Sequence, residues 1–412
     1  MLQKNSQNTA LNYMKNNITK LNNCYGCGVC VKACPTKIIS LKETSDGFYT
    51  PIINEQDKCI DCGLCLRICA FNHDTVAQDN TSTDSYAAWS NTPTVREHCS
   101  SGGIGFEIGR WAIDNGYKAV GVRYNPLKNR AEHYIASTVE DFMPSVGSKY
   151  IPSYTAEAFD EINLKEKYLV TGTPCQIDSF RRLIRQHKKE DNFILLDFFC
   201  HGVPSLLLWD KYTSVLKEKI GNISYASWRN KSIGWHDSYA INADSIENKS
   251  TPGWKVFYDL TTNEKRHAYH SRMSEGDLFY SFFFGHYCLN MCCHKSCKYK
   301  LESSAADIRI GDLWGNKYKN NEAGVSVVLA FTPRGKQVLS DLQNLCTLVS
   351  EPLEVSTEGQ MKHCAPMPAI RDKVIGQLRS QKSLKEIKSG LIFRYNLRFL
   401  PGRIINKIKR TL

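Results

Sequence analysis

The chain has 412 residues, of which 42% are hydrophobic, and its formal net charge is +12 at neutral pH. This length leaves room for two or three domains. No stretch approaches the roughly 18 apolar residues of a membrane-spanning helix, and the polar segment from Met1 to Lys20 has no apolar core of an export signal. We therefore expect a cytoplasmic protein whose 17 cysteines serve metals rather than secreted disulfides.

Eight cysteines near the N-terminus repeat the spacing C-x2-C-x2-C-x3-C twice. This is the bacterial two-cluster ferredoxin pattern, in which the fourth cysteine of each run ligates the cluster of the other run. We therefore predict two [4Fe-4S] clusters, one on Cys24, Cys27, Cys30 and Cys69, and the other on Cys59, Cys62, Cys65 and Cys34. Structural zinc sites usually pair two C-x2-C hooks across a longer gap, so zinc fits this spacing poorly.

Beyond the cysteine runs, apolar segments of strand length alternate with amphipathic helical segments. Strands are expected at 119–124, 168–171, 193–199, 307–310 and 325–331, and helices at 103–115, 175–187, 205–219 and 334–346. This alternation predicts an α/β fold with a mostly parallel sheet. We divide the chain into a small ferredoxin-like module (15–80), a larger α/β domain (85–370) and a tail (371–412), with 221–285 as an insertion or cap over the site.

A second group of cysteines lies at strand ends of the larger domain. Its members are Cys175, Cys200, Cys288, Cys292, Cys293 and Cys297. The first two follow strands, and ligands collect at the carboxyl ends of parallel strands. We predict a third [4Fe-4S] cluster, with one ligand from Cys175 or Cys200 and three from Cys288, Cys293 (or its neighbour Cys292) and Cys297. A zinc site and ordinary buried thiols are the alternatives.

Six segments of the larger domain occur in an order that resembles a known family. They are Ser100-Ser101-Gly102-Gly103, Gly147-Ser148-Lys149-Tyr150, Gly172-Thr173-Pro174-Cys175-Gln176, Cys200-His201-Gly202-Val203-Pro204, Trp228-Arg229-Asn230-Lys231 with Gly234-Trp235, and Gly311-Asp312-Leu313-Trp314-Gly315. After a two-cluster ferredoxin module, this series resembles the coenzyme F420 hydrogenase/dehydrogenase beta-subunit family. It is most similar to a bacterial branch often associated with surface-polysaccharide synthesis.

The resemblance implies a flavoprotein with one FAD per chain and a [4Fe-4S] cluster near the isoalloxazine ring. Members of the family include beta subunits of deazaflavin-reducing hydrogenases and formate dehydrogenases, and relatives that reduce chlorophyll-pathway intermediates with ferredoxin electrons. Carried onto this sequence, the resemblance implies that FAD is bound by Ser100, Ser101, Gly102, Gly103, Ser148, Lys149, Thr173, Gln176, Asp312 and Trp314.

Some of these residue types suit flavin chemistry. The pair Gly102-Gly103 ahead of a helix would let backbone N–H groups approach a diphosphate, although such a pair is more often a turn. Lys149 would hold a phosphate or place positive charge near the ring, and His201, next to Cys200, would relay a proton. Lys149 and His201 are therefore our candidate catalytic residues.

The positive charge is concentrated at the C-terminal end of the sequence. From Arg371 onward there are twelve Lys and Arg residues and two acids, with apolar residues between them. A basic amphipathic segment can lie on an anionic membrane surface, and the alternative is a helix docked on the body with a solvated face. No recognised nucleic-acid-binding motif accompanies the charge, so we do not expect a nucleic-acid partner.

The sequence thus predicts an FAD- and [4Fe-4S]-dependent oxidoreductase acting on an unidentified organic partner, either a deazaflavin coenzyme or a surface-polysaccharide intermediate. The alternative is a non-catalytic subunit that delivers electrons to a partner enzyme. We expect the protein partner to be a ferredoxin or an oxidoreductase subunit, and the tail to allow contact with the inner face of the membrane. No G-x-G-x-x-G follows a strand, so no nicotinamide coenzyme is expected.

Overall fold

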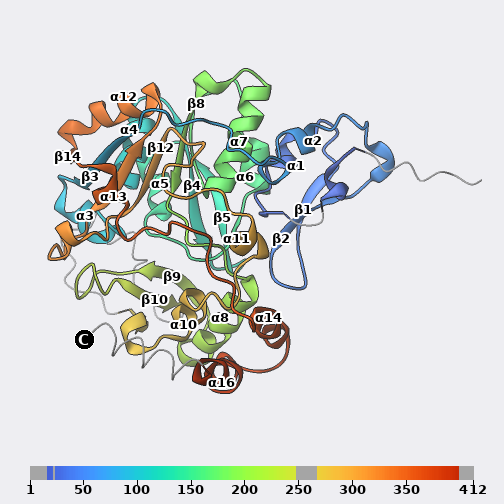
Figure 1. Cartoon of the computed structure of the whole chain (residues 1–412), viewed down its shortest axis with the longest axis vertical. Coiled ribbons are helices and arrows are strands. Elements are labelled where there is room, and N and C mark those ends of the chain that lie inside the picture. Colours follow the sequence, from blue (N-terminus) through green and yellow to red (C-terminus); the bar gives the residue numbers. More distant parts are fainter. Residues whose placement is uncertain (1–15, 22–23, 247–266, 399–412) are drawn as a thin grey trace, which may run out of the picture.

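The computed structural model describes residues 16–21, 24–246 and 267–398, and consists of a small N-terminal module packed on a larger α/β domain (Figure 1). The last part of the predicted tail, 399–412, lies outside the described residues, as does residue 15 of the predicted module. None of the helices in the described ranges has the length and hydrophobicity needed to span a bilayer.

The N-terminal module is built from short elements. An antiparallel hairpin, β1 (Ile39–Glu43) and β2 (Tyr49–Ile53), accompanies two helices, α1 (Val29–Ala33) and α2 (Leu64–Arg67). Each helix follows a glycine in the left-handed region, Gly28 with φ 74° and Gly63 with φ 65°. Glycine adopts this conformation without steric cost, so each cysteine run can turn sharply before its helix.

The larger domain contains a nine-stranded sheet with the order β14-β3-β13-β12-β8-β7-β4-β5-β6. Its strands are β3 (Asp84–Ser90), β4 (Lys118–Asn125), β5 (Arg130–Ala136), β6 (Ser153–Tyr154), β7 (Tyr168–Thr171), β8 (Phe193–Phe198), β12 (Ile308–Asp312), β13 (Ser326–Ala330) and β14 (Cys346–Ser350). The predicted α/β class is confirmed. The sheet is mixed, however, rather than mostly parallel, because only the β12-β8-β7-β4 ladders and β5-β6 are parallel.

The antiparallel strands are those that the sequence reading missed or connected wrongly. β4 and β5 are joined by the turn at 126–129, which is too short for the crossover that a parallel pair needs. β3, β13 and β14 extend the other edge as antiparallel neighbours. The expected helix at 334–346 ends earlier, as α12 (Pro333–Asp341), and Cys346 begins the edge strand β14.

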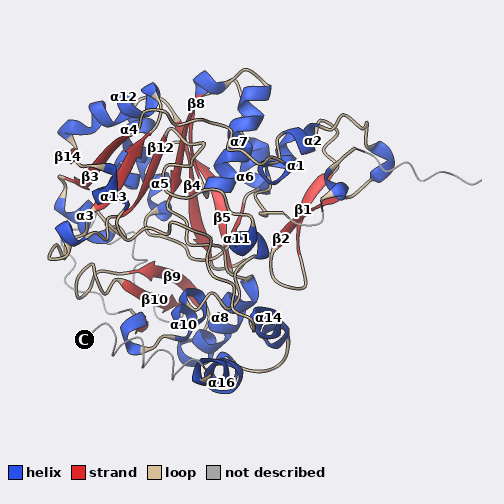
Figure 2. Ribbon diagram, viewed as in Figure 1, coloured by secondary structure: helices blue, strands red, loops and turns tan. Residues whose placement is uncertain are grey.

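Helices cover both faces of this sheet (Figure 2). On one face lie α4 (Ile104–Asp114) and α12, and on the other lie α6 (Ala156–Glu161) and α7 (Pro174–Gln186). The side chains of successive strand residues point to opposite faces of the sheet. Leu169 and Ile194 pack with α4 and α12, whereas Val170 and Leu195 pack with α6 and α7. This burial on both faces explains why the central strands read as continuous apolar runs.

A second, smaller layer lies below the sheet in Figure 1. It combines the antiparallel strands β9 (Ile223–Arg229), β10 (Tyr239–Ser245) and β11 (Tyr269–Arg272) with helices α8 (Leu206–Ile220), α10 (Leu278–Phe284), α14 (Arg371–Arg379), α15 (Leu384–Ile387) and α16 (Phe393–Leu397). The region 221–285, expected to be a cap, therefore contains this small sheet, although 247–266 lies outside the described residues. The described part of the tail packs on the body, with Val374 and Ile387 fully buried.

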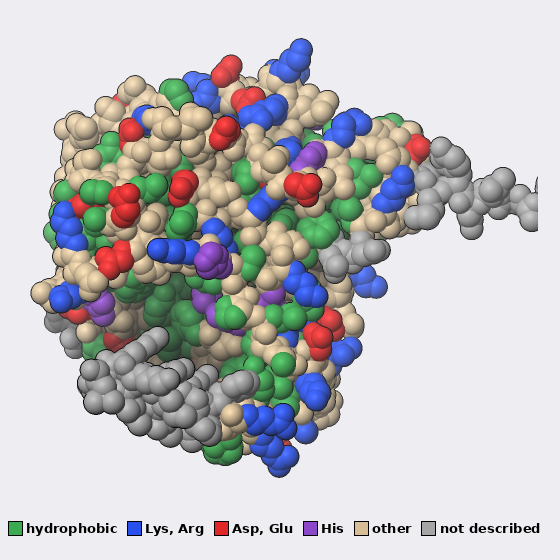
Figure 3. All heavy atoms as spheres, in the orientation of Figure 1, with side chains coloured by type: hydrophobic (Ala, Val, Ile, Leu, Met, Phe, Trp, Pro, Cys, Tyr) green, Lys and Arg blue, Asp and Glu red, His purple; other side chains and the backbone are tan. Residues whose placement is uncertain are grey.

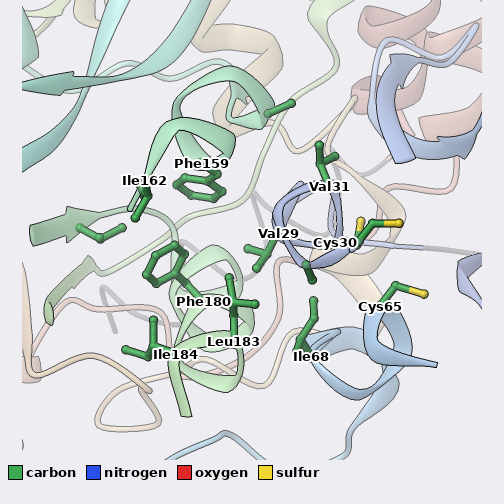
Figure 4. Close-up of a cluster of buried hydrophobic side chains, with 14 of the residues drawn as sticks. Val29, Cys30, Val31, Cys65, Ile68, Phe159, Ile162, Phe180, Leu183 and Ile184 are labelled. Atoms are coloured by element: carbon green, nitrogen blue, oxygen red, sulfur yellow. The ribbon is translucent and has the colours of Figure 1, made fainter. Parts of the chain in front are cut away.

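One hydrophobic core joins the N-terminal module to the larger domain. Val29 and Ile68 of the module are at most 1% exposed and pack with Phe159, Phe180 and Leu183 from α6 and α7 (Figure 4). Burial of such side chains stabilises an interface by roughly 25 cal/mol per Å² of apolar surface. The module is therefore fixed to the face of the sheet domain and does not hang from a linker.

Candidate functional site

The structure brings the fourth cysteine of the second run to the first three cysteines of the first run. Burial raises the pKa of the Cys27 thiol to about 12, and the neighbouring thiols of Cys69 and Cys24 raise it further. Burial also raises the pKa of Cys30, where Cys27, Cys69 and Cys24 again lie close by. Cys24, Cys27, Cys30 and Cys69 therefore form the group expected for one cluster.

The remaining four cysteines of the module line a second, small apolar pocket. The pocket wall consists of Cys34, Cys59, Cys62 and Cys65 with side chains that include Ile38, Ile53 and Ile60. Burial raises the pKa of the Cys65 thiol, and the neighbouring Cys62 and Cys34 raise it further. Two groups of four thiols therefore occur in the combination that the spacing predicts.

A third group of thiols forms where the module meets the larger domain. Its members are Cys175 in the first turn of α7, Cys200 directly after β8, Cys293 on α11 (Met291–Lys295) and Cys297 just beyond that helix. Burial raises the pKa of Cys200 to about 11, and Cys297 raises it further. The pKa of Cys175 is raised by burial and by three neighbouring thiols, those of Cys27, Cys200 and Cys293.

This third group differs from the set that the sequence predicted. Both Cys175 and Cys200 belong to it, whereas only one was expected. Cys288 does not, because its carbonyl accepts a hydrogen bond from Ser205 N–H at 2.8 Å and its side chain is fully buried in the apolar core below the sheet. Cys292 faces the module instead, and its thiol donates to the carbonyl of Cys24 at 3.5 Å.

The thiols of these groups are too far apart to bind a single metal ion together. In the described part of the chain, no three His, Cys, Asp or Glu side chains approach closely enough to hold one metal ion. A [4Fe-4S] cube is larger than one ion, and its four thiolates stand at the corners of that larger volume. Four cysteines around a common space fit the chemistry of such a cube.

A cavity of about 620 Å³ adjoins the third group at the carboxyl ends of the central strands. Figure 3 shows a hollow with apolar side chains between the upper part of the molecule and the smaller layer below. Of the residues singled out in the sequence, the cavity wall includes Ser100, Ser101, Gly103, Ser148, Lys149, Thr173, Gln176, His201, Asp312 and Trp314. Segments far apart in the sequence therefore converge on one space.

The N-terminus of α4 supplies backbone donors to this cavity. Gly103 is the N-cap residue, with φ 90°, and no side chain caps the helix. Ile104 and Gly105 of the first turn line the cavity, and first-turn N–H groups have no partner within a helix. They suit a diphosphate, as predicted for the glycine pair.

Gly102 is needed for close backbone packing and does not line the cavity. Its N–H donates to Ser326 Oγ at 3.0 Å, its carbonyl accepts from Ser90 N–H at 2.8 Å, and an added Cβ would lie 2.3 Å from the carbonyl oxygen of Ala88. Gly102 is absent from the cavity lining. Only the second glycine of the predicted pair therefore borders the space where a cofactor would bind.

Lys149 holds the loop on which it lies. Its ammonium donates to the carbonyls of Pro144 at 3.0 Å and Val146 at 2.9 Å, and burial lowers the pKa of Lys149 to about 7. The N–H of Ser148 donates to Ser100 Oγ at 2.9 Å, which ties this loop to the start of α4. Lys149 thus shapes the cavity wall, and two of its three N–H donors are engaged by backbone carbonyls of its own loop.

Thr173 and Gln176 cap helix α7. Gln176 Oε1 accepts the N–H of Thr173 at 2.8 Å, and Gln176 Nε2 donates to Ser153 Oγ at 3.3 Å. The capping fixes the first turn of α7, and it brings Thr173 Oγ1 within 3.2 Å of Cys175 Sγ. These two residues therefore orient a thiol of the third group as well as the cavity wall.

Asp312 is held by residues to which the sequence reading assigned no role. The guanidinium of Arg229 donates to both carboxylate oxygens at 2.7 and 3.1 Å, and Trp235 Nε1 donates at 2.8 Å. The ring of Trp235 stacks on that of Trp314, with centroids 4.6 Å apart. Arg229 belongs to the segment Trp228-Arg229-Asn230-Lys231 noted in the sequence, but only the folded chain shows its pairing with Asp312.

His201 forms a pair with a second histidine. Its Nε2 lies 2.8 Å from Nε2 of His286, so one ring donates to the other. Burial lowers the pKa of His201 to about 3, with a further contribution from the neighbouring His286 and Lys300. Lys300 also lines the cavity, and no side-chain hydrogen bond or ion pair to it occurs among the described residues. The proton relay predicted for His201 would therefore involve His286.

Comparison with known proteins agrees with this architecture. Residues 165–355 match the family model for the C terminus of the coenzyme F420 hydrogenase/dehydrogenase beta subunit, and residues 23–73 match a 4Fe-4S dicluster domain. A search of curated proteins gave no significant match. Among solved structures, a chain in the F420-reducing [NiFe] hydrogenase complex from Methanosarcina barkeri is similar, with 15% identity, TM-score 0.41, and coverage of 75% of this chain and 92% of that chain. The chain therefore combines a 4Fe-4S dicluster domain at residues 23–73 with a segment, residues 165–355, that matches the C-terminal family of coenzyme F420 hydrogenase/dehydrogenase beta subunits.

Proposed function

We propose that this iron–sulfur protein is an FAD-dependent oxidoreductase that exchanges single electrons at its clusters for an electron pair at an organic substrate. When bound, [4Fe-4S] clusters would supply one-electron transfer and FAD would supply the conversion to two-electron chemistry. The residues of this chain would position these groups, exclude water and move protons.

The observation that carries the proposal is the place of the third thiol group. The thiol of Cys175 neighbours that of Cys27 in the module, and its Sγ lies 3.2 Å from Oγ1 of Thr173 in the cavity wall. Cys200 itself lines the cavity. A cluster on Cys175, Cys200, Cys293 and Cys297 would therefore lie between the first cluster of the module and the cavity, where it connects the two.

The packing of the module supports a fixed path for electrons. Tyr25 donates to the carbonyl of Ser296 at 2.6 Å, directly beside Cys297. Lys298 donates to the carbonyls of Ala70 and Thr75, both at 2.9 Å, and so links the other cysteine run to the same segment. With the shared apolar core, these contacts keep the module and the third group at one separation.

The second cluster site of the module is the one nearest to solvent. Cys62 is exposed, and the neighbouring Ile60 is 63% exposed. An exposed apolar residue beside a metal site suits a transient contact with another redox protein. We therefore place the exchange of electrons with a ferredoxin or a partner oxidoreductase subunit at this edge.

The cavity has features that fit a flavin. The uncapped first turn of α4 offers N–H donors to a diphosphate. The cavity wall also carries Asp312, fixed by Arg229, with the rings of Trp314 and Tyr239 beside it. We propose that the organic substrate, a deazaflavin coenzyme or a surface-polysaccharide intermediate, reaches the same cavity, where the pair of His201 and His286 exchanges protons.

Iron and flavin analysis after anaerobic reconstitution tests the proposal. Three clusters require about 12 Fe per chain, together with one FAD. Cys200→Ser should lower the iron content by about 4 Fe per chain, while Cys288→Ser, which alters a buried thiol outside the group, should leave it unchanged. Equal iron loss in both variants would contradict the third cluster.

A non-catalytic electron-transfer subunit is the second candidate, because the dicluster domain alone suffices for it. Turnover separates the two candidates: the isolated holoprotein should reduce a dye or a deazaflavin at the expense of a reduced ferredoxin. Material with full iron but no bound flavin, and no turnover, would leave only the electron-delivery role.

A further inference from the structure

The last described helices present a surface that is unconnected with the cavity. A continuous helical stretch runs from α15 through a π-helical turn at 388–392 into α16. Leu384 and Ile387 of this stretch are fully buried against the body, but Phe393 is 56% exposed and Leu397 is 46% exposed. These two apolar side chains are four residues apart and therefore lie on one face of the helix.

Basic residues surround this apolar pair. From Lys382 to Arg398 there are five Lys or Arg residues and one acid, Glu386. The carboxylate of Glu386 accepts from the N–H of Ser383 at 2.7 Å, so it caps its own helix. Lys385, Arg394 and Arg398 make no ion pair among the described residues. Figure 3 shows Lys and Arg side chains gathered around apolar ones at the lower right of the molecule.

The sequence that follows has the same character. Residues 399–412 lie outside the described residues, but their composition is four Lys or Arg with no acid, together with Phe399, Leu400, Ile404, Ile405 and Ile408. The basic and apolar composition of α16 therefore continues to the last residue of the sequence.

We propose that the surface formed by Phe393 and Leu397 with Lys385, Arg394 and Arg398 docks on an anionic lipid bilayer. Anionic headgroups attract clustered Lys and Arg, and apolar side chains on the same helix enter the boundary between headgroups and acyl chains. A polyanion such as RNA would satisfy the charges but would leave the exposed apolar pair in water. No helix of the described ranges spans a bilayer, so the contact would be peripheral.

The orientation would leave the redox edge accessible. Figure 1 places α14 and α16 at the lower end of the molecule, whereas the module with β1 and β2 projects at the right. Docking through α16 would therefore hold the protein at a membrane surface while Ile60 and Cys62 still meet a soluble electron-transfer partner.

Vesicle flotation of the full-length holoprotein tests this inference. We expect it to float with phosphatidylcholine vesicles that contain about one third phosphatidylglycerol, not with pure phosphatidylcholine, and to dissociate at high salt. Arg394→Glu with Arg398→Glu should lower the partition coefficient on the order of twentyfold or more, because each lost basic residue is worth about fivefold. Phe393→Gln with Leu397→Gln should lower it several-fold.

Matched substitutions elsewhere on the surface control for general changes of charge and hydrophobicity. Lys319→Glu alters an exposed lysine, and Leu127→Gln alters a leucine that is 91% exposed, both outside this surface. Both should float as the unaltered protein does. Flotation that is unaffected by the α16 substitutions, equal binding to neutral vesicles, or binding to RNA but not to anionic vesicles would overturn the inference. Iron and flavin content would show that the variants are folded.

Discussion

The N-terminal module and the sheet domain hold their cysteines in different ways. In the module, eight cysteines lie between Cys24 and Cys69, on short loops and helices of five residues or fewer. In the sheet domain, the four thiols of the third group come from α7, the end of β8 and the segment around α11, which are separated by long stretches of sequence. The first arrangement follows from local spacing, whereas the second needs the whole domain to be folded.

This difference has a consequence for stability. The described elements of the module are too short to be stable alone, and they gain order from the cysteine ligands and from the core shared with α6 and α7. The sheet domain has extensive cores on both faces of its sheet, and most of their members are aliphatic and aromatic side chains. We therefore expect the module to depend on its clusters and the sheet domain to hold the third group in place even without iron.

Removal of iron should have the largest effect and should separate the two regions. After anaerobic chelation, hydrogen exchange should show loss of protection across residues 24–72, because the cysteine runs are no longer held together. Strands β7 and β8 should stay protected, because their side chains are buried on both faces. Loss of protection in both regions, or in neither, would contradict the expectation that only the module depends on iron.

Loss of the buried ion pair in the central sheet should have the second-largest effect on stability. The guanidinium of Arg309 donates to both oxygens of Asp197 at 2.7 Å, and neither side chain is exposed. Asp197→Asn would leave the Arg309 charge buried without its counterion and should lower the free energy of unfolding by about 3–5 kcal/mol. Glu166→Gln, which removes the partner of Lys118 at the surface, should have a much smaller effect, because solvent screens an exposed ion pair. Equal effects in urea unfolding would refute this ranking.

The cavity wall should give the sheet domain an acid sensitivity that the module lacks. His133 is buried, its Nδ1 has no hydrogen-bond partner among the described residues, and burial lowers its pKa to about 4. As the pH falls below about 6.5, the unfolded chain binds a proton that the folded chain does not, so stability falls. Between pH 7.5 and 5, His133 should account for about 2 kcal/mol of the loss, and this part should be absent in His133→Gln, whereas the contribution of His201 should remain. Parallel stability curves for both proteins would refute the assignment.

The smallest effect concerns the core shared by the two regions. Ile68 is 1% exposed between the module and α7. Ile68→Val removes one methylene group and should lower the free energy of unfolding by about 0.5–1.5 kcal/mol. Ile60→Val, at a 63% exposed position of the same module, should change it by about 0.5 kcal/mol or less. If the two substitutions had the same effect, the module would not be packed on the domain as described.

Much of the fold could be predicted from local patterns. The strands β4, β7, β8, β12 and β13 and the helices α4, α7 and α8 all lie where apolar periodicity placed them, because both faces of the sheet are buried. The antiparallel edges could not be predicted in this way. Periodicity indicates that a segment is a strand, but the partner of each edge strand depends on connections and on packing across the sheet.

In the candidate site, too, the sequence identified the residues but not the contacts between them. The segments carrying Lys149, Thr173, His201 and Asp312 were recognised from the sequence, and they converge on one cavity. Their contacts were not foreseen: Lys149 binds loop carbonyls, Thr173 caps α7, and Asp312 is held by Arg229. These contacts join residues on different elements, and no local spacing records them.

The sequence by itself determined the spacing of the eight cysteines of the module, and it allowed us to predict how they would be shared between two clusters, because the loop around each cube would span only a few residues. Tertiary structure alone decided the third group. It brought Cys175 and Cys200 together with Cys293 and Cys297, and it directed Cys288 into the apolar core and Cys292 toward the module. The reason is physical: strand ends that are far apart in the chain become neighbours only when the sheet forms, and that alignment decides which thiols face a common space.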